Sequence, residues 1–220
     1  MAVNRQASAS APAWSRPRRL FGGGTTGNER LTGATGGILV VLLAIIGLTI
    51  VRLGPLLWVH LFVGMLLIGP VALKLASTGY RFFRYYTADP PYKRKGPPAP
   101  ALRLIAPLVV LTTIVVFASG VALLFVGPSS RGTLLPIHKA SFIIWVAFMA
   151  VHVLAHLPTM LSSLKADYVR PARREDSGGW PNDANGRAGR VLSLASALVL
   201  GLVLAILVIP DFAPWIAARH

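Results

Sequence analysis

The sequence contains no cysteine, and this absence excludes several kinds of site at once. Disulfide bonds, thiolate-bound metals, iron–sulfur clusters and the CxxCH attachment of c-type haem all require cysteine. Acidic residues are also scarce, with only 7 Asp and Glu in 220 residues, and none lies within a long apolar segment. Because proton- and cation-coupled carriers usually place a carboxylate inside the membrane, this scarcity argues against a transporter.

Long apolar segments dominate what is present. Hydrophobic residues make up 54% of the chain and charged residues only 13%, a composition typical of integral membrane proteins. Five segments are long enough to cross a bilayer as helices: Gly33–Val51, Leu56–Leu75, Leu104–Val126, Pro136–Leu157 and Val191–Ile209. Short connections join the first to the second and the third to the fourth, which makes each pair antiparallel. We therefore expect an all-α integral membrane fold, with a four-helix transmembrane bundle over residues 31–161.

Polar segments complete the expected organisation. Residues 1–30 are rich in Ala, Ser, Gly and Arg and lack the early apolar run of a signal peptide, so we expect a disordered cytoplasmic tail. Residues 162–190 are rich in charge and glycine and predict a basic cytoplasmic loop. Residues 191–220 then form a fifth transmembrane helix and a short external tail.

The distribution of basic residues predicts the orientation. Of the 22 Lys and Arg, five lie in the N-terminal tail, six between the second and third apolar segments, and six between the fourth and fifth. The opposite side holds only Arg52, Arg131, Lys139 and Arg219, and Lys74 lies inside the second segment. The positive-inside rule then places the N-terminus in the cytoplasm and the C-terminus outside the cell membrane. The net charge of +15 therefore indicates membrane lipid as a partner rather than nucleic acid.

Histidines on two of the apolar segments suggest a cofactor site. At 100° per residue, six residues of the fourth helix fall within about 40° of one line along its face: His138, Phe142, Trp145, Met149, His152 and His156. Depth in the membrane can be counted from the external end of each helix at about 1.5 Å per residue. By this count His60 in the second segment lies within a few ångström of the depth of His138. Two imidazoles across a bundle interior form the arrangement that binds an iron porphyrin from both sides. We interpret His60 and His138 as ligands of a haem iron.

Small and basic residues at the same expected level support this interpretation. Three glycines lie where a missing side chain would leave space for a flat macrocycle: Gly64, Gly47 and Gly120. Three basic residues lie at the expected external mouth, where they suit haem propionates: Arg52, Arg131 and Lys139. The alternative is that the glycines are helix-packing contacts and the basic side chains are simply solvated.

The two remaining histidines of the fourth helix lie deeper in the predicted membrane. His152 and His156 are roughly 20 Å further along the helix than His138, so neither can share a haem with His60. Lys74 lies near the level of His152, where it can ligate or hydrogen-bond, but we expect it to snorkel to the cytoplasmic interface. A metal site made by the two histidines alone would lack ligands. We interpret this pair as a vestigial or modified second site, with quinone as a candidate ligand.

These histidines resemble those of the bacterial cytochrome b-561 family and its relatives, the cytochrome b subunits of hydrogenases and formate dehydrogenases. The resemblance is carried by one histidine near the outer end of the second helix and by two histidines of the fourth helix that are fourteen residues apart, His138 and His152. It covers about Leu31–Leu161 and leaves the fifth helix outside. It implies a four-helix bundle of the haem-binding type, which holds b-type haem and passes electrons between quinone and a partner. His60 and His138 then correspond to the axial ligands of an outer haem, and His152 to one ligand of an inner haem.

The sequence departs from this family at the inner haem. There the family uses a histidine near the cytoplasmic start of the first helix, but Arg30–Gly37 contains none. A mono-haem variant follows, unless Lys74 or another subunit completes the inner site. The expected function is a membrane b-type cytochrome that transfers electrons between a quinone or redox partner and another protein. The alternatives are a haem-free membrane scaffold or assembly subunit, whose histidines hydrogen-bond between helices, and a metal or small-solute permease.

Overall fold

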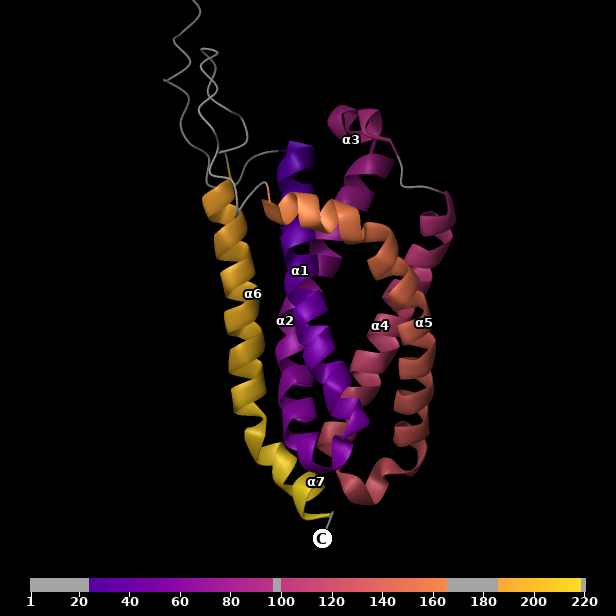
Figure 1. Ribbon diagram of the computed structural model, residues 1–220, viewed down its shortest axis with the longest axis vertical. Helices are drawn as coiled ribbons and strands as arrows, with labels where there is room; N and C mark the ends of the chain where they lie inside the picture. Colours follow the sequence, from indigo (N-terminus) through magenta and orange to yellow (C-terminus); the bar gives the residue numbers. More distant parts are fainter. Residues whose placement is uncertain (1–23, 97–99, 166–185, 219–220) are drawn as a thin grey trace, which may run out of the picture.

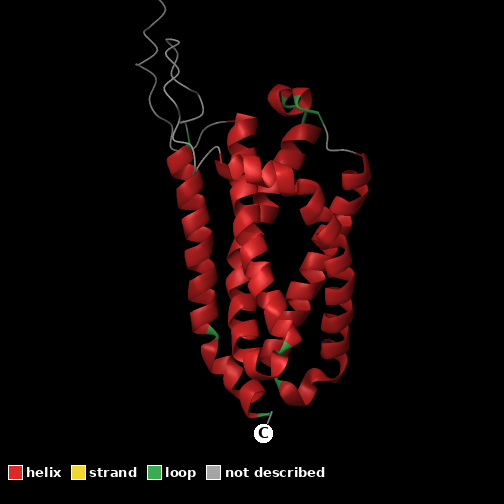
Figure 2. Ribbon diagram, viewed as in Figure 1, coloured by secondary structure: helices red, strands yellow, loops and turns green. Residues whose placement is uncertain are grey.

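The computed structural model of the chain describes residues 24–96, 100–165 and 186–218, and these residues form helices and no strand (Figure 2). Five of the helices are long and apolar enough to cross a membrane. They are α1 (Gly24–Val51), α2 (Leu53–Tyr86), α4 (Pro100–Val126), α5 (Arg131–Leu164) and α6 (Arg187–Leu207). The short elements are α3 (Pro90–Arg94), η2 (Pro128–Ser130), η5 (Ile209–Phe212) and α7 (Ala213–Ala217). The prediction of an all-helical chain with five helices of membrane-spanning type is confirmed for the described residues.

Four of the long helices form a closed arrangement of two hairpins (Figure 1). Helix α1 packs against α2, α2 against α4, α4 against α5, and α5 against α1. Only Arg52 separates α1 from α2, and the turn between α4 and α5 begins at Gly127, whose positive φ of 75° favours glycine. We call the end of the molecule that holds these two connections the lower end, and the opposite end the upper end, as they lie in Figure 1.

Helix α6 packs on the outside of this arrangement, mainly against α2. The two backbones touch: a Cβ at Gly69 would lie 2.0 Å from the carbonyl oxygen of Ala197, and one at Gly201 would lie 2.2 Å from that of Leu66. On α6, Ala197, Gly201 and Ala205 are all buried at four-residue spacing. Small residues at this spacing allow close helix approach in membranes. They fix the fifth helix to the bundle.

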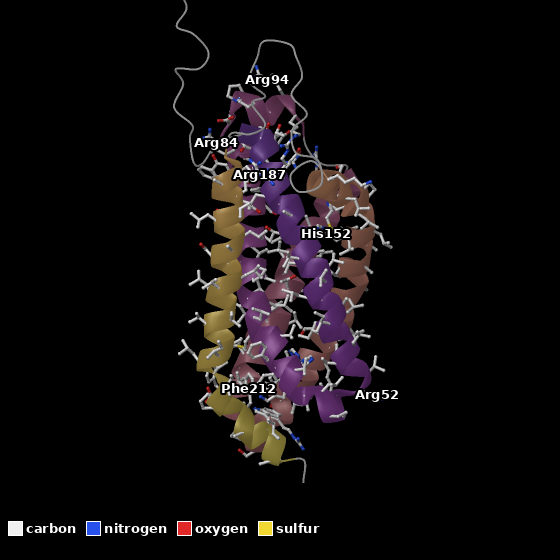
Figure 3. The ribbon with its side chains drawn as sticks, turned by 60° about the vertical axis from the view of Figure 1, so that its left-hand side comes forward. Arg52, Arg84, Arg94, His152, Arg187 and Phe212 are labelled. Carbon is white, nitrogen blue, oxygen red and sulfur yellow. The ribbon has the colours of Figure 1, made fainter. Side chains whose placement is uncertain are left out.

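The segment after α6 turns under the lower end of the molecule (Figure 1). Phe212, labelled in Figure 3, is only 1% exposed and meets the ring of Trp58 edge-on at 6.1 Å. The indole nitrogen of Trp215 donates a hydrogen bond of 3.3 Å to the carbonyl oxygen of Leu124 in α4. That carbonyl is available because the residue four positions later is Pro128, which has no N–H. A proline two residues after the end of α4 thus leaves free the carbonyl oxygen that holds α7.

Helix α1 begins earlier than the sequence predicted. Residues 24–30, which we placed in a disordered tail, are helical, whereas residues 1–23 lie outside the described residues. The early turns are held by contacts to distant parts of the chain, because Glu29 forms ion pairs with Arg81 at 3.5 Å and with Lys95. Sequence patterns within the tail contain no sign of these partners.

The last turns of α5 bend across the upper end of α1 in Figure 1. This part of the helix contains Pro158, which cannot donate a backbone hydrogen bond and so favours a bend. The side chain of Met160 comes within 4.0 Å of the position that a Cβ on Gly36 would take. Helix α5 therefore extends into the predicted loop 162–190, of which residues 166–185 lie outside the described residues.

Candidate functional site

A cavity of about 320 Å³ lies among the lower halves of α1, α2, α4 and α5. This volume falls at the lower end of the range of about 300–1,000 Å³ for small-molecule pockets. Most of the wall is aliphatic or aromatic, and the C-terminal segment closes part of it with Trp215 and Ala218. Four polar or charged side chains interrupt this apolar wall: His60, His138, Arg131 and Lys139. The sequence had singled out all four as site residues.

His60 is held by helix α1. Its Nδ1 atom lies 2.9 Å from the hydroxyl oxygen of Thr49. The Thr49 hydroxyl donates its own hydrogen to the carbonyl oxygen of Ile46, so its oxygen acts as acceptor toward the histidine. This arrangement favours the tautomer in which Nδ1 carries the proton, and that tautomer leaves a lone pair on Nε2 of a ring that lines the cavity.

His138 is held in the same tautomer by helix α4. Its Nδ1 atom lies 3.1 Å from the carbonyl oxygen of Val116 and 3.1 Å from the hydroxyl oxygen of Ser119. Because a carbonyl oxygen can only accept, Nδ1 must carry the proton here as well. Both imidazoles of the cavity thus have Nδ1–H fixed to a neighbouring helix and an unprotonated Nε2.

The three glycines differ in their surroundings. A Cβ on Gly120 would lie 3.1 Å from the Cε1 atom of His138, so this glycine leaves space for the imidazole ring itself. Gly64 lines the cavity, and a Cβ there would meet only a methyl group of Ile46, at 3.6 Å. Gly47 is not part of the cavity wall, and within the described residues nothing lies within 4 Å of a Cβ there.

The basic residues at the lower end also separate into two groups. Arg131 and Lys139 line the cavity, and both are otherwise exposed. Arg52 is exposed in the connection after α1 and does not line the cavity (Figure 3). The first two can therefore pair with an anionic group of a ligand in the cavity, whereas Arg52 lies apart from it.

Several side chains that hold the histidines or line the cavity had no role assigned from the sequence, although Trp145 was placed on the same helix face as His138. Thr49 and Ser119 are hydroxyl residues in apolar helices, which is a visible signal, but their histidine partners lie on other helices. Trp145 is buried in the wall of the cavity, where its indole donates a 2.9 Å hydrogen bond to Thr113. Trp215 lies in a segment that the sequence assigned to an external tail. Nothing in its local pattern indicates the cavity.

Lys74 points into the bundle, contrary to the expectation that it snorkels. Its ammonium donates a 2.8 Å hydrogen bond to the carbonyl oxygen of Thr32 on α1. The space for it comes from Gly36, where a Cβ would lie 3.2 Å from Nζ. The lysine therefore occupies the upper part of the α1–α2 interface, opposite in the molecule to the cavity.

His152 and His156 lie together in the upper half of α5 (Figure 3 labels His152). Their ring centroids are 4.7 Å apart with an angle of 55° between the planes, and neither ring lines the cavity. Among the described residues, no group of three or more His, Cys, Asp or Glu is arranged to hold a metal ion. The structure therefore separates this pair from His60 and His138.

Comparison with models of known protein families, with curated proteins and with solved structures finds no match for this chain. The fold and the cavity define a multi-pass helical chain of membrane type with an internal apolar pocket. Two imidazoles from different helices, His60 and His138, line this pocket.

Proposed function

We propose that the chain is a membrane b-type cytochrome that holds one haem between His60 and His138. The main support is that two imidazoles from different helices line one apolar cavity. The Nδ1 atom of each is hydrogen-bonded to a neighbouring helix, that of His60 to α1 and that of His138 to α4. A neutral imidazole with a free Nε2 is the form that binds iron, and a hydrogen bond from the other nitrogen orients the ring. Arg131 and Lys139 on the same wall suit carboxylates of the ligand. The residues present therefore fit a haem.

A haem bound here would supply a one-electron redox centre. The chain's own contribution is to hold the two imidazoles, to exclude water with aliphatic and aromatic walls, and to balance the ligand's negative charge at the mouth. In this proposal the chain passes single electrons between a quinone or another redox partner and a further protein.

We propose one haem rather than two. His152 would need a second ligand from a facing helix, but α1 contains no histidine. Lys74, which lies on the upper part of α2, already donates to Thr32 and fills the space beside Gly36. Among the described residues, α1 therefore offers no histidine as a second ligand for His152, and Lys74 occupies the space beside Gly36.

The proposed location is the cell membrane, with the N-terminus in the cytoplasm and the C-terminus outside. Basic residues from three helices support this orientation, because Arg84 of α2, Arg94 of α3 and Arg187 of α6 all lie at the upper end while Arg52 lies at the lower end (Figure 3). Under the positive-inside rule the upper end is cytoplasmic. The cavity then lies near the external surface.

The test is spectroscopic. Protein purified in detergent from cells supplied with haem should show a Soret band, a reduced spectrum of a six-coordinate b-type centre, and one haem per polypeptide by pyridine haemochrome. His60→Ala and His138→Ala should each abolish or strongly change this spectrum. His156→Ala is the matched control and should leave it unchanged. A folded, colourless wild-type protein supplied with haem would refute the proposal.

A second candidate is a haem-free scaffold or assembly subunit. The observation in its favour is that both histidines form hydrogen bonds between helices, to Thr49 and to Val116. Such bonds stabilise helix association by about 0.6–2 kcal/mol in membranes. A scaffold predicts that His60→Ala lowers thermal stability without any change in visible absorbance, which separates the two functions.

A further inference from the structure

The same local arrangement holds each histidine on a different helix. On α1, Thr49 donates its hydroxyl hydrogen to the carbonyl of Ile46, and on α4, Ser119 donates to the carbonyl of Val116. In both cases the carbonyl lies three residues before the hydroxyl. In both cases the hydroxyl oxygen lies within hydrogen-bond distance of the histidine Nδ1 on the next long helix. Each hairpin, α1–α2 and α4–α5, therefore carries one imidazole together with its acceptor.

The two arrangements differ in one respect. His138 has two acceptors for its Nδ1–H, the backbone carbonyl of Val116 and the hydroxyl of Ser119, both at 3.1 Å. Among the described residues, His60 has one acceptor, the hydroxyl of Thr49 at 2.9 Å. Removal of the Ser119 hydroxyl would leave His138 bound to a carbonyl. Removal of the Thr49 hydroxyl would leave the His60 Nδ1–H without a partner in an apolar wall, which is unfavourable.

We propose that Thr49 is a positioning residue that sets the tautomer and the electron-donor strength of His60, and through them the reduction potential of the haem. This inference rests on the function proposed above. A ligating imidazole whose Nδ1–H donates to an oxygen is more basic at Nε2. Stronger donation favours the oxidised iron, which carries the higher charge. Loss of the Thr49 hydroxyl should therefore favour the reduced state and raise the potential.

The experiment is a redox titration of haem-loaded, detergent-purified wild-type protein and variants. Thr49→Val removes the hydroxyl but keeps the branched shape, and we expect an upward shift equivalent to about a tenfold change in the equilibrium constant. For a one-electron couple a tenfold change corresponds to about 59 mV. Tenfold is the lower end of what removal of a ligand's hydrogen-bond partner costs in metal affinity or activity. The electron paramagnetic resonance spectrum of the oxidised protein should change as well.

Three further variants make the test specific. Thr49→Ser restores the hydroxyl and should return the potential to the wild-type value. Ser119→Ala should shift the potential less than Thr49→Val, because the Val116 carbonyl remains. Thr112→Val is the matched control on α4 and should have no effect, since its hydroxyl bonds only to carbonyls of its own helix.

The outcomes separate this inference from the proposed function. An unchanged potential in Thr49→Val, or an equal shift in Thr49→Ser, would overturn the role of the Thr49 hydroxyl while leaving the cytochrome intact. A shift in Ser119→Ala as large as that in Thr49→Val would also overturn it. If Thr49→Val no longer retains haem, wild-type behaviour of Thr49→Ser supports the inference and altered behaviour of Thr49→Ser refutes it. Wild-type protein without haem would refute the proposed function and the inference together.

Discussion

Replacement of Gly120 by alanine is the most direct test of the cavity's geometry. A Cβ at this position would lie 3.1 Å from Cε1 of His138, whereas carbon atoms in contact prefer about 3.5–4.0 Å. The imidazole would therefore have to move by about 0.4–0.9 Å, the difference between these separations. The added methyl group would touch the ring that the proposed haem site requires.

Such a movement would break the hydrogen bond that fixes the ring. The Nδ1 nitrogen of His138 already lies 3.1 Å from each of its two acceptor oxygens, and N–H···O bonds weaken beyond an N···O distance of about 3.2 Å. Because both acceptors share one hydrogen, the loss counts as one bond, or about 0.5–1.5 kcal/mol. At about 1.4 kcal/mol per tenfold, this is a reduction of about 2- to 12-fold in haem affinity.

The assay is haem content per polypeptide at limiting haem, together with the Soret position and thermal stability of the detergent-purified protein. Gly47→Ala is the matched control, since nothing in the described part of the chain lies within 4 Å of its Cβ. We expect Gly120→Ala to lose haem affinity and Gly47→Ala to behave as wild type. If both variants bind haem equally well with unchanged spectra, the position assigned to the His138 ring is wrong.

Three other predictions concern the fold. Gly201→Ala should destabilise the protein by about 3 kcal/mol or prevent folding, because even one methyl group overlaps the α2 backbone. Gly79→Ala should not, because nothing among the described residues lies within 4 Å of its Cβ. The melting temperature in detergent measures both effects. Trp215→Phe should cost about 0.5–1.5 kcal/mol by leaving the Leu124 carbonyl unpaired, and an equal melting temperature would contradict that bond. Burial raises the pKa of Tyr92 above its usual value of 10.0, so its contribution to stability is complete below about pH 10 and is lost as pH rises through the higher folded-state pKa. Tyr92→Phe should remove this alkaline loss, as measured by melting temperatures between about pH 8 and pH 12, and a parallel decline in both proteins would contradict the assignment.

The sequence predicted the long helices well because each span is defined by local apolar content and length. Matching His60 with His138 also needed only local counting, since a helix rises by a fixed amount per residue. Both residues line the same cavity, together with Arg131 and Lys139.

The features that escaped prediction depend on contacts between distant segments. Snorkelling of Lys74 was the expectation from its position near a helix end, but the choice depends on a carbonyl of α1 and on the absence of a side chain at Gly36. The acceptor for His60 lies on another helix, and helix rotation about its own axis cannot be read from one sequence. For the same reason Gly47 and Gly120 have similar sequence contexts but different surroundings.

The bond between Trp215 and Leu124 has a consequence for how the protein is made. Trp215 and Ala218 follow both hairpins in the chain, so the hairpins, with their histidines, leave the ribosome before these two residues do. During synthesis the cavity therefore remains open on the side that these two residues later close. Pro128, by withholding one N–H from α4, prepares the attachment point about ninety residues before the tryptophan that uses it.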